Sequence, residues 1–190
     1  MRETASSSIL PNYLRCRSLP FEPKPREYLK IQTVIIDEQE EFTRDWDWYA
    51  VGQDGHIGHF TSAGMRVLPK SVREDRETTE IIARYFFEQA PVVGKWSVRA
   101  EAEADCGGWK QQGFERYIRD FALMASKGLF SFDTDLIRTE KGRYYLVAIP
   151  ERILLVNDLP PDIRNLVSRI HAPFRFIDCP YIPEPTTTDW

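Results

Sequence analysis

The sequence predicts an α+β fold: a single domain built on an antiparallel or mixed sheet of about five to six strands, with three helices mostly on one face. Three observations support this class. Short aromatic and β-branched runs are bounded by turn signals, and three longer segments carry apolar residues at helical spacing. The segments also do not alternate as βαβ units. A length of 190 residues suits one domain with a substantial core.

Proline and polar residues set the expected domain boundaries. Residues 1–27 are predicted to form an irregular arm, because four prolines follow a small, polar start that we expect to be disordered over residues 1–8. Residues 28–178 are assigned to the α+β domain. Residues 179–190 contain further prolines and a threonine run, which predict an irregular tail.

The strongest local signal is a β-hairpin centred on Asp54 and Gly55. A two-residue turn there needs positive φ angles, which Asp and Gly tolerate. Counting outward from such a turn pairs Trp48 with Thr61 and places Tyr49 opposite Phe60. Alternation then assigns Tyr49, Val51 and Phe60 to one face, and Trp46, Trp48, Ala50, Ile57 and Thr61 to the other. Both faces are apolar, so we expect both to be covered.

The remaining strands are predicted from short runs rich in β-branched and aromatic residues. These runs are residues 28–36, 95–100, 129–133, 143–149 and 174–177. The acidic run at residues 37–41 follows the first of them, and we expect it to be a solvated loop.

Three helices are predicted from apolar residues spaced three and four apart. The first covers residues 71–89, where Ser71 and Glu74 match a capping box and Pro91 ends the helix. The second covers residues 109–127, and Gly128 suits the left-handed position after it. The third opens at Pro160 or Pro161. The core-facing residues of the last two are Phe114, Tyr117, Ile118, Phe121 and Ala125, and then Ile163, Leu166, Val167 and Ile170.

Composition limits the classes of partner. The net charge of −4 argues against a nucleic-acid partner, which would favour a basic surface. The sequence has no apolar run long enough for a membrane span or a signal peptide. Cys16, Cys106 and Cys179 are widely spaced, without a metal-binding or redox motif. These features predict a cytoplasmic protein with no membrane partner and no cofactor.

The titratable residues offer three weak candidates for chemistry. His56 and His59 lie beside Asp54, but residues three apart on a strand point to opposite faces, so we expect no metal site there. Cys106 precedes a predicted helix and could be an activated thiolate, although a buried or incidental cysteine is the simpler interpretation.

Asp133 and Asp135 are the third candidate. Two residues apart on a strand, they would share a face and could act as a carboxylate pair. Alternatively, they hydrogen-bond the turn that follows the strand.

Several segments together resemble a family of uncharacterised bacterial proteins. They are W-Y-A-x-x-x-D-G-H-I-x-x-F-T-S-x-G (residues 48–64), G-L-F-x-F-D (128–133), Y-Y-L-V-A-x-P (144–150) and D-L-P-P (158–161). That family shares a W-[FY]-A-[VIL]-D-x-x-G hairpin and a G-L-[FY]-x-[FY]-D strand. This chain has Gly52 where the family has Asp before the turn. The resemblance implies a bacterial cytosolic domain, and it transfers no activity and no catalytic residue.

The sequence lacks a phosphate-binding loop, a dinucleotide glycine pattern, a nucleophile elbow and an HExxH motif. We therefore expect a non-enzymatic cytosolic domain that binds another protein, in the manner of immunity or accessory proteins. The alternative is a small-molecule-binding protein or a hydrolase-type enzyme with a pocket beside the Asp54-Gly55 hairpin. Oligomeric state stays open, and no catalytic or metal-binding residue is assigned. The candidate binding residues are Trp46, Trp48, Asp54, His56, His59, Trp109 and Asp133.

Overall fold

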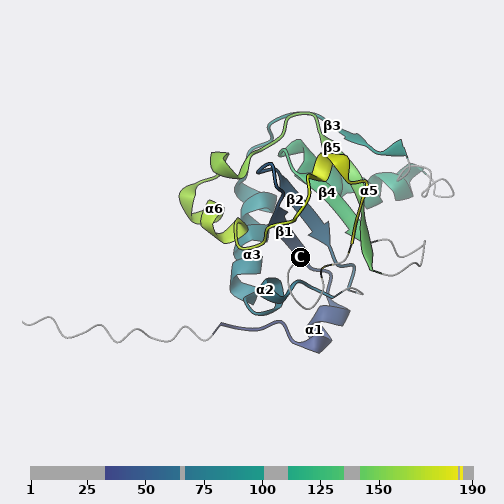
Figure 1. Ribbon diagram of the computed structural model, residues 1–190. Coiled ribbons are helices and arrows are strands. Elements are labelled where there is room, and N and C mark those ends of the chain that lie inside the picture. Colours follow the sequence, from purple (N-terminus) through teal and green to yellow (C-terminus); the bar gives the residue numbers. More distant parts are fainter. Residues whose placement is uncertain (1–32, 65–66, 101–110, 135–141, 184, 186–190) are drawn as a thin grey trace, which may run out of the picture. The chain divides into compact units, whose positions relative to one another are not determined.

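A curled, mixed sheet of six strands organises the part of the chain that the computed structural model describes, residues 33–64, 67–100, 111–134, 142–183 and 185 (Figure 1). The strand order is β1-β2-β4-β5-β3, and β6 also pairs with β5. The β2 and β4 strands are parallel, and the other pairs are antiparallel. The strands are β1 (Asp47–Val51), β2 (Ile57–Thr61), β3 (Trp96–Val98), β4 (Phe130–Thr134), β5 (Arg143–Pro150) and β6 (Tyr181–Pro183).

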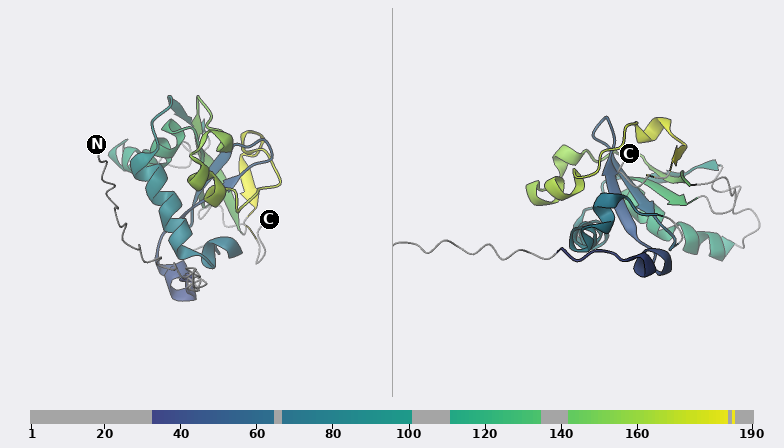
Figure 2. Two further views of the ribbon diagram at one scale, coloured as in Figure 1. Left: turned by 90° about the vertical axis from the view of Figure 1, so that its left-hand side faces the viewer. Right: turned by 60° about the horizontal axis from the view of Figure 1, so that its bottom comes forward.

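Three main helices accompany the sheet, and the predicted α+β single domain is confirmed. They are α3 (Arg76–Arg84), which continues as the π-helical turn η1 (Tyr85–Gln89), α5 (Gln111–Ser126) and α6 (Pro161–Val167). Figure 2 shows α3 and α6 side by side, and both contact β1, whereas α5 contacts β4 and β5. Pro161 stands in the first turn of α6, and Gly128 follows α5 with φ of +94°, as the sequence predicts.

The two sides of the sheet carry different cores. On one side lies an aromatic core in which Trp48 stacks on Phe60 (ring centroids 4.2 Å apart) and Phe60 stacks on Phe132 (4.9 Å). Phe176 covers these rings from the C-terminal segment. The other, the helix side, joins strand residues Tyr49, Val51 and Ile57 to helix residues Ile82, Phe86, Met124, Ile163 and Val167. Each large apolar side chain buried in this way contributes about 1.5–3 kcal/mol of transfer free energy.

The hairpin exists, but the predicted register is wrong by one residue. The turn has three residues, 53–55, since the Gly52 N–H donates to the carbonyl of His56 (2.8 Å) and the Gly55 N–H donates to the carbonyl of Gly52 (3.0 Å). Gly55 takes φ of +78°, and Asp54 stays out of the left-handed region. The shift places Phe60 opposite Trp48, on the aromatic side, because a one-residue slip exchanges the faces of a strand.

The segment before the hairpin differs from its prediction. Residues 33–36 run extended without joining the sheet, and residues 28–32 lie outside the described part of the chain. The acidic run forms a short helix, α1 (Glu38–Thr43), instead of a solvated loop. The Asp37 carboxylate caps it by accepting the Glu40 N–H (2.8 Å). Glu41 is buried and accepts the main-chain N–H of Leu68 (2.5 Å).

The predicted capping box at Ser71 and Glu74 is also wrong. A short helix α2 (Lys70–Arg73) occupies that stretch, and α3 begins after it. Asp75 is the N-cap of α3, and its carboxylate accepts the Thr78 N–H (3.0 Å).

Two expectations near the C-terminus are wrong as well. Residues 174–177 do not form a strand, and a 3-10 turn, η3 (Phe176–Asp178), stands there instead. The tail expected to be irregular contributes β6, in which Ile182 is fully buried opposite Tyr144. A second 3-10 turn, η2 (Val156–Asp158), precedes α6.

Candidate functional site

The richest cluster of titratable and hydroxyl side chains in the described part of the chain is a polar network between the sheet and α5. His59 and Thr61 of β2 and Ser131 and Asp133 of β4 share one face, because His59 pairs with Ser131 in the parallel register and residues two apart point the same way. The polar network comprises two hydrogen-bonded groups on this face, one of Asp47, His59 and Ser131 and the other of Thr61, Asp133, Tyr117 and Tyr145.

His59 uses both nitrogens of its ring inside this network. Its Nδ1 lies 2.7 Å from the hydroxyl of Ser131, and its Nε2 lies 2.8 Å from Oδ1 of Asp47. The three residue types are those of a hydrolytic triad. However, His59 and Ser131 are both fully buried, so the Ser131 hydroxyl has no path to a substrate. The imidazole therefore ties β1, β2 and β4 together.

Asp133 is held by its own chain on both carboxylate oxygens. Oδ1 accepts hydrogen bonds from Thr61 Oγ1 (2.9 Å) and the Thr134 N–H (2.7 Å), and Oδ2 accepts one from Tyr117 (2.7 Å). The Tyr117 hydroxyl also hydrogen-bonds that of Tyr145. These bonds fasten α5 to three strands of the sheet.

Burial shifts the protonation of this part of the polar network. Desolvation raises the pKa of Asp133 above its ordinary value, although the hydrogen bonds that Asp133 accepts oppose the shift. Desolvation and then the negative charge of Asp133 raise the pKa of Tyr117, so the Tyr117 hydroxyl stays protonated and donates.

Asp45 adds a third carboxylate near this region. Its Oδ1 accepts the Ala63 N–H (2.6 Å), and desolvation followed by repulsion from Asp47 and Asp133 raises its pKa. Among the described residues, no group of three His, Cys, Asp or Glu side chains has the geometry to hold a metal ion.

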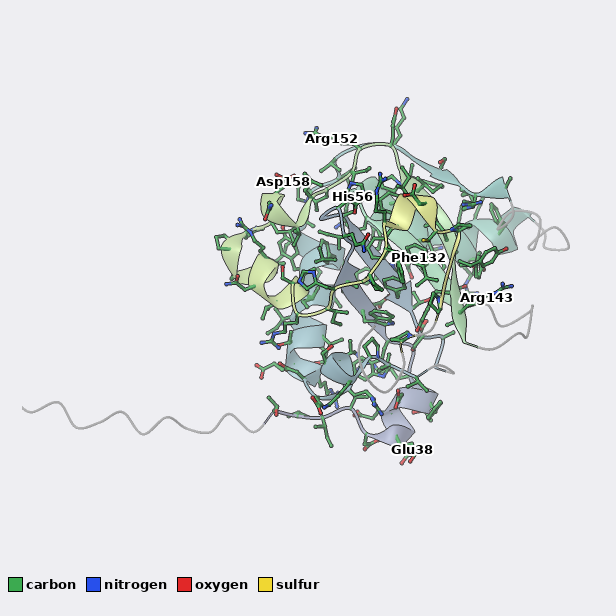
Figure 3. The ribbon with its side chains drawn as sticks, viewed as in Figure 1. Glu38, His56, Phe132, Arg143, Arg152 and Asp158 are labelled. Carbon is green, nitrogen blue, oxygen red and sulfur yellow. The ribbon has the colours of Figure 1, made fainter. Side chains whose placement is uncertain are left out.

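Asp54 and His56 lie at the tip of the hairpin, and Figure 3 places His56 at the turn end. Asp54 Oδ2 lies 3.0 Å from His56 Nδ1 and 3.2 Å from Arg175 Nε. The His56 ring stacks on Phe130, on the aromatic side of the sheet. The side chains of His56 and His59 thus lie on opposite sides of the sheet, as the alternation of side chains along a strand predicts.

Other parts of the chain pack on this tip. The Gln53 N–H donates to the carbonyl of Phe174 (3.1 Å), and the Val156 N–H donates to that of Gly55 (2.9 Å). The C-terminal segment and η2 therefore contact the turn on the sides where the alternative function predicts a pocket. A partly open cavity elsewhere, between Tyr49, Thr79 and Arg169, measures about 20 Å³, which is room for a water molecule.

The tryptophans predicted as binding residues have different positions. Trp46 and Trp48 are 2% and 1% exposed, so both rings belong to the core. The Trp46 indole donates to the carbonyl of Glu40 (3.2 Å), and the Arg44 guanidinium lies over its ring. Trp109, like Asp135 and Cys106, lies outside the described residues.

Sequence reasoning missed three exposed apolar side chains within residues 34–42, because it assigned the first part of this segment to a strand. Val34, Ile35 and Phe42 are 54%, 60% and 46% exposed. Ile35 also lines an open hollow of about 480 Å³, together with Ile36, Lys70, Arg73 and Glu74. The signal available in the sequence was the apolar triplet that directly precedes the acidic run.

Comparisons with known proteins add no information about the function of this site. No family model matches the chain, and neither a curated protein nor a solved structure matches it. Within the described residues, none of the helices has both the length and the apolar character to cross a membrane.

Proposed function

We propose that this chain is a non-enzymatic domain that binds another protein through the exposed apolar side chains of residues 34–42 and the hollow that Ile35 lines. The observation that carries the proposal is the exposure of Val34, Ile35 and Phe42 within one short stretch of chain. Exposed apolar groups rimmed by charges are typical of protein–protein contact sites.

The shape and charge of the hollow favour a macromolecular partner over a small ligand. The hollow is open, and its walls combine Ile35 and Ile36 with the charged side chains of Lys70, Arg73 and Glu74. Small-molecule sites are usually enclosed and bury most of the ligand surface. A partner could bury the apolar side chains and pair with the charges at the rim.

The arrangement of the polar groups supports a role without catalysis. A catalytic acid or nucleophile must reach a substrate atom. Ser131 and His59 are fully buried, and the carboxylate of Asp133 is already bonded to Thr61, Thr134 and Tyr117. In this interpretation the polar network stabilises the scaffold that presents the exposed apolar side chains of residues 34–42.

The experiment is capture of partners from a native lysate, followed by a Kd measurement with the purified full chain and the purified candidate. Replacing Ile35 and Phe42 together with Asp should weaken binding at least about tenfold, because truncating a hot spot costs about 2 kcal/mol or more. Ile177→Asp is the matched control, since Ile177 is 47% exposed on η3. Equal affinities for the double variant and the control would contradict the proposal.

The alternative, a hydrolase-type enzyme, is suggested by the contacts that His59 makes with Asp47 and Ser131. A fluorophosphonate probe labels an accessible activated serine. We expect Ser131 to stay unlabelled in the folded chain. Labelling that disappears in Ser131→Ala would favour the enzyme instead.

A further inference from the structure

The edge of β3 has main-chain groups that point away from the sheet. On its inner side, the Arg99 N–H donates to the carbonyl of Val147 (3.0 Å), and the Glu151 N–H donates to that of Lys95 (2.9 Å). Hydrogen-bonded and non-hydrogen-bonded residues alternate along an antiparallel strand, so the main-chain N–H and C=O groups of Lys95, Ser97 and Arg99 point toward β5. The N–H and C=O groups of Trp96 and Val98 therefore point outward.

These outward groups are open in the described part of the chain, where neither Trp96 nor Val98 has a further hydrogen-bond partner. Figure 1 shows β3 at the rim of the sheet beside β5. Trp96 is 38% exposed, and Val92, four residues earlier, is 65% exposed. An open edge with neighbouring apolar side chains is the surface to which an extended segment adds as a strand.

Among the described residues, β3 and the chain beside it carry three basic side chains, Lys95, Arg99 and Arg152. Lys95 and Arg99 lie on the same face as Ser97, because residues two apart on a strand share a face. Arg152 is exposed and lies against Gly94, at the end of the molecule where Figure 3 labels it. Glu151 is an exposed acidic residue among the described residues next to β3, and Glu101, Glu103 and Asp105, which follow in the sequence, lie outside the described part of the chain. An acidic strand would complement this edge.

The same charges disfavour a second copy of this chain. The antiparallel self-pairing that uses all four outward groups places Ser97 opposite Ser97 of the other copy. Lys95 then faces the other copy's Arg99, and like charges directly opposite each other destabilise a strand pair. Short, lysine-bearing edges are a common protection against self-association.

We propose that β3 accepts an extended acidic segment of a partner protein as an added antiparallel strand. The main-chain groups of Trp96 and Val98 would bind the segment's backbone, the Trp96 ring would pack on an apolar side chain, and Lys95 and Arg152 would attract its carboxylates. This inference does not depend on the surface around residues 34–42.

The test uses the full chain and a heptapeptide of alternating glutamate and valine, with a lysine–valine heptapeptide as the matched control. We expect the acidic peptide to perturb the NMR amide signals of Trp96 and Val98 and to slow their hydrogen exchange. Its affinity should fall as salt is added, because exposed charges are screened. The basic peptide should bind far more weakly.

Three variants separate the contributions of the main-chain N–H, the Trp96 ring and the Lys95 charge to peptide affinity. Trp96→Pro removes an N–H that points away from β5, so the sheet keeps its inner bonds and peptide affinity should fall about threefold to tenfold. Trp96→Ala keeps that N–H and removes the ring, and Lys95→Glu reverses one charge. Both should weaken the acidic peptide, and Lys95→Glu should strengthen the basic one. If Trp96→Pro fails to fold, these two variants still decide the outcome.

Several results would overturn the inference. They are absence of binding, equal binding of both peptides, or amide shifts confined to other elements. Concentration-dependent shifts of Trp96 and Val98 without peptide would assign the edge to a second copy. The double substitution at Ile35 and Phe42 should leave peptide binding unchanged, which keeps this test separate from that of the proposed function.

Discussion

Trp48 illustrates how a single residue carries the aromatic core. It is 1% exposed, stacks on Phe60 and meets the edge of Tyr144 at 5.6 Å between ring centroids. We expect Trp48→Ala to lower the free energy of unfolding by about 3–5 kcal/mol, because the substitution leaves a large cavity among rigid rings. Urea unfolding measures this change.

The control for that substitution is Trp96→Ala. Trp96 is partly exposed at the sheet edge, so its truncation should cost about 1 kcal/mol or less. Similar losses for the two variants would mean that Trp48 does not occupy the core.

Asp133 should give the chain a pH-dependent stability. Its pKa is higher in the folded chain than its ordinary value of 3.8, chiefly through desolvation. The folded state therefore binds the proton of Asp133 more tightly than the unfolded state does. The resulting contribution to the free energy of unfolding is largest below the unfolded pKa and is lost as the pH rises through the folded pKa. The free energy of unfolding of the natural chain, minus that of Asp133→Asn, should increase as the pH falls from about 7 to about 4.

Tyr117→Phe provides the comparison for that titration. It removes a hydrogen bond that favours the ionised carboxylate of Asp133, so the folded pKa should rise further and the pH dependence should steepen. Unfolding in urea across this pH range measures both effects, and a difference that shrinks toward low pH would contradict the assignment.

Among the elements, α3 depends on a side chain that sequence reasoning overlooked. Asp75 accepts the N–H and the hydroxyl of Thr78 (3.0 and 2.8 Å) and pairs with Arg169 of the segment after α6. We expect Asp75→Ala to lower the free energy of unfolding by about 1 kcal/mol, and Asp75→Asn, which keeps the cap, to lower it less. The exposed neighbour Glu74 supplies the control, Glu74→Ala, with little effect.

The same aspartate has the opposite pH behaviour to Asp133. Desolvation raises the pKa of Asp75, but the hydrogen bonds from Thr78 and Arg169 outweigh it and the net pKa is lowered. Its contribution to stability is therefore present above the unfolded pKa and is lost as the pH falls through the lower folded value.

At the scale of the whole molecule, the C-terminal strand completes both the sheet and the core. Ile182 of β6 is fully buried in the aromatic core, and the Leu146 N–H of β5 donates to the carbonyl of Pro180 (2.9 Å). Ile182→Ala should therefore lower the free energy of unfolding by about 2–5 kcal/mol in urea.

Ile177→Ala is the matched control for this prediction. Ile177 lies 47% exposed on η3, so its truncation should cost far less. Hydrogen exchange at the Leu146 amide should accelerate in the Ile182 variant alone. An effect of Ile182→Ala near zero would indicate that the tail contributes nothing to the core.

Local patterns in the sequence determined the three main helices and the hairpin. The apolar spacing in α3, α5 and α6, Pro161 and Gly128 at helix ends, and Asp54-Gly55 in the hairpin all act through residues close in the chain. They were sufficient for the α+β class. They could not distinguish a two-residue turn from a three-residue turn, since both accept Asp followed by Gly.

Only the tertiary structure decided which residues lie in the core on each side of the sheet and which residues come together in the candidate sites. The contact of His59 with Ser131 joins residues 72 positions apart, and Trp48 became a core residue because Phe60, Tyr144 and the C-terminal segment enclose it. Residues 33–36 are predicted as a strand, but their main chain hydrogen-bonds Arg73 at the end of α2 and Arg76 at the start of α3, and Val34 and Ile35 stay exposed. Local conformational preference depends on neighbours in the chain, whereas burial and hydrogen-bond partners depend on which distant segments meet.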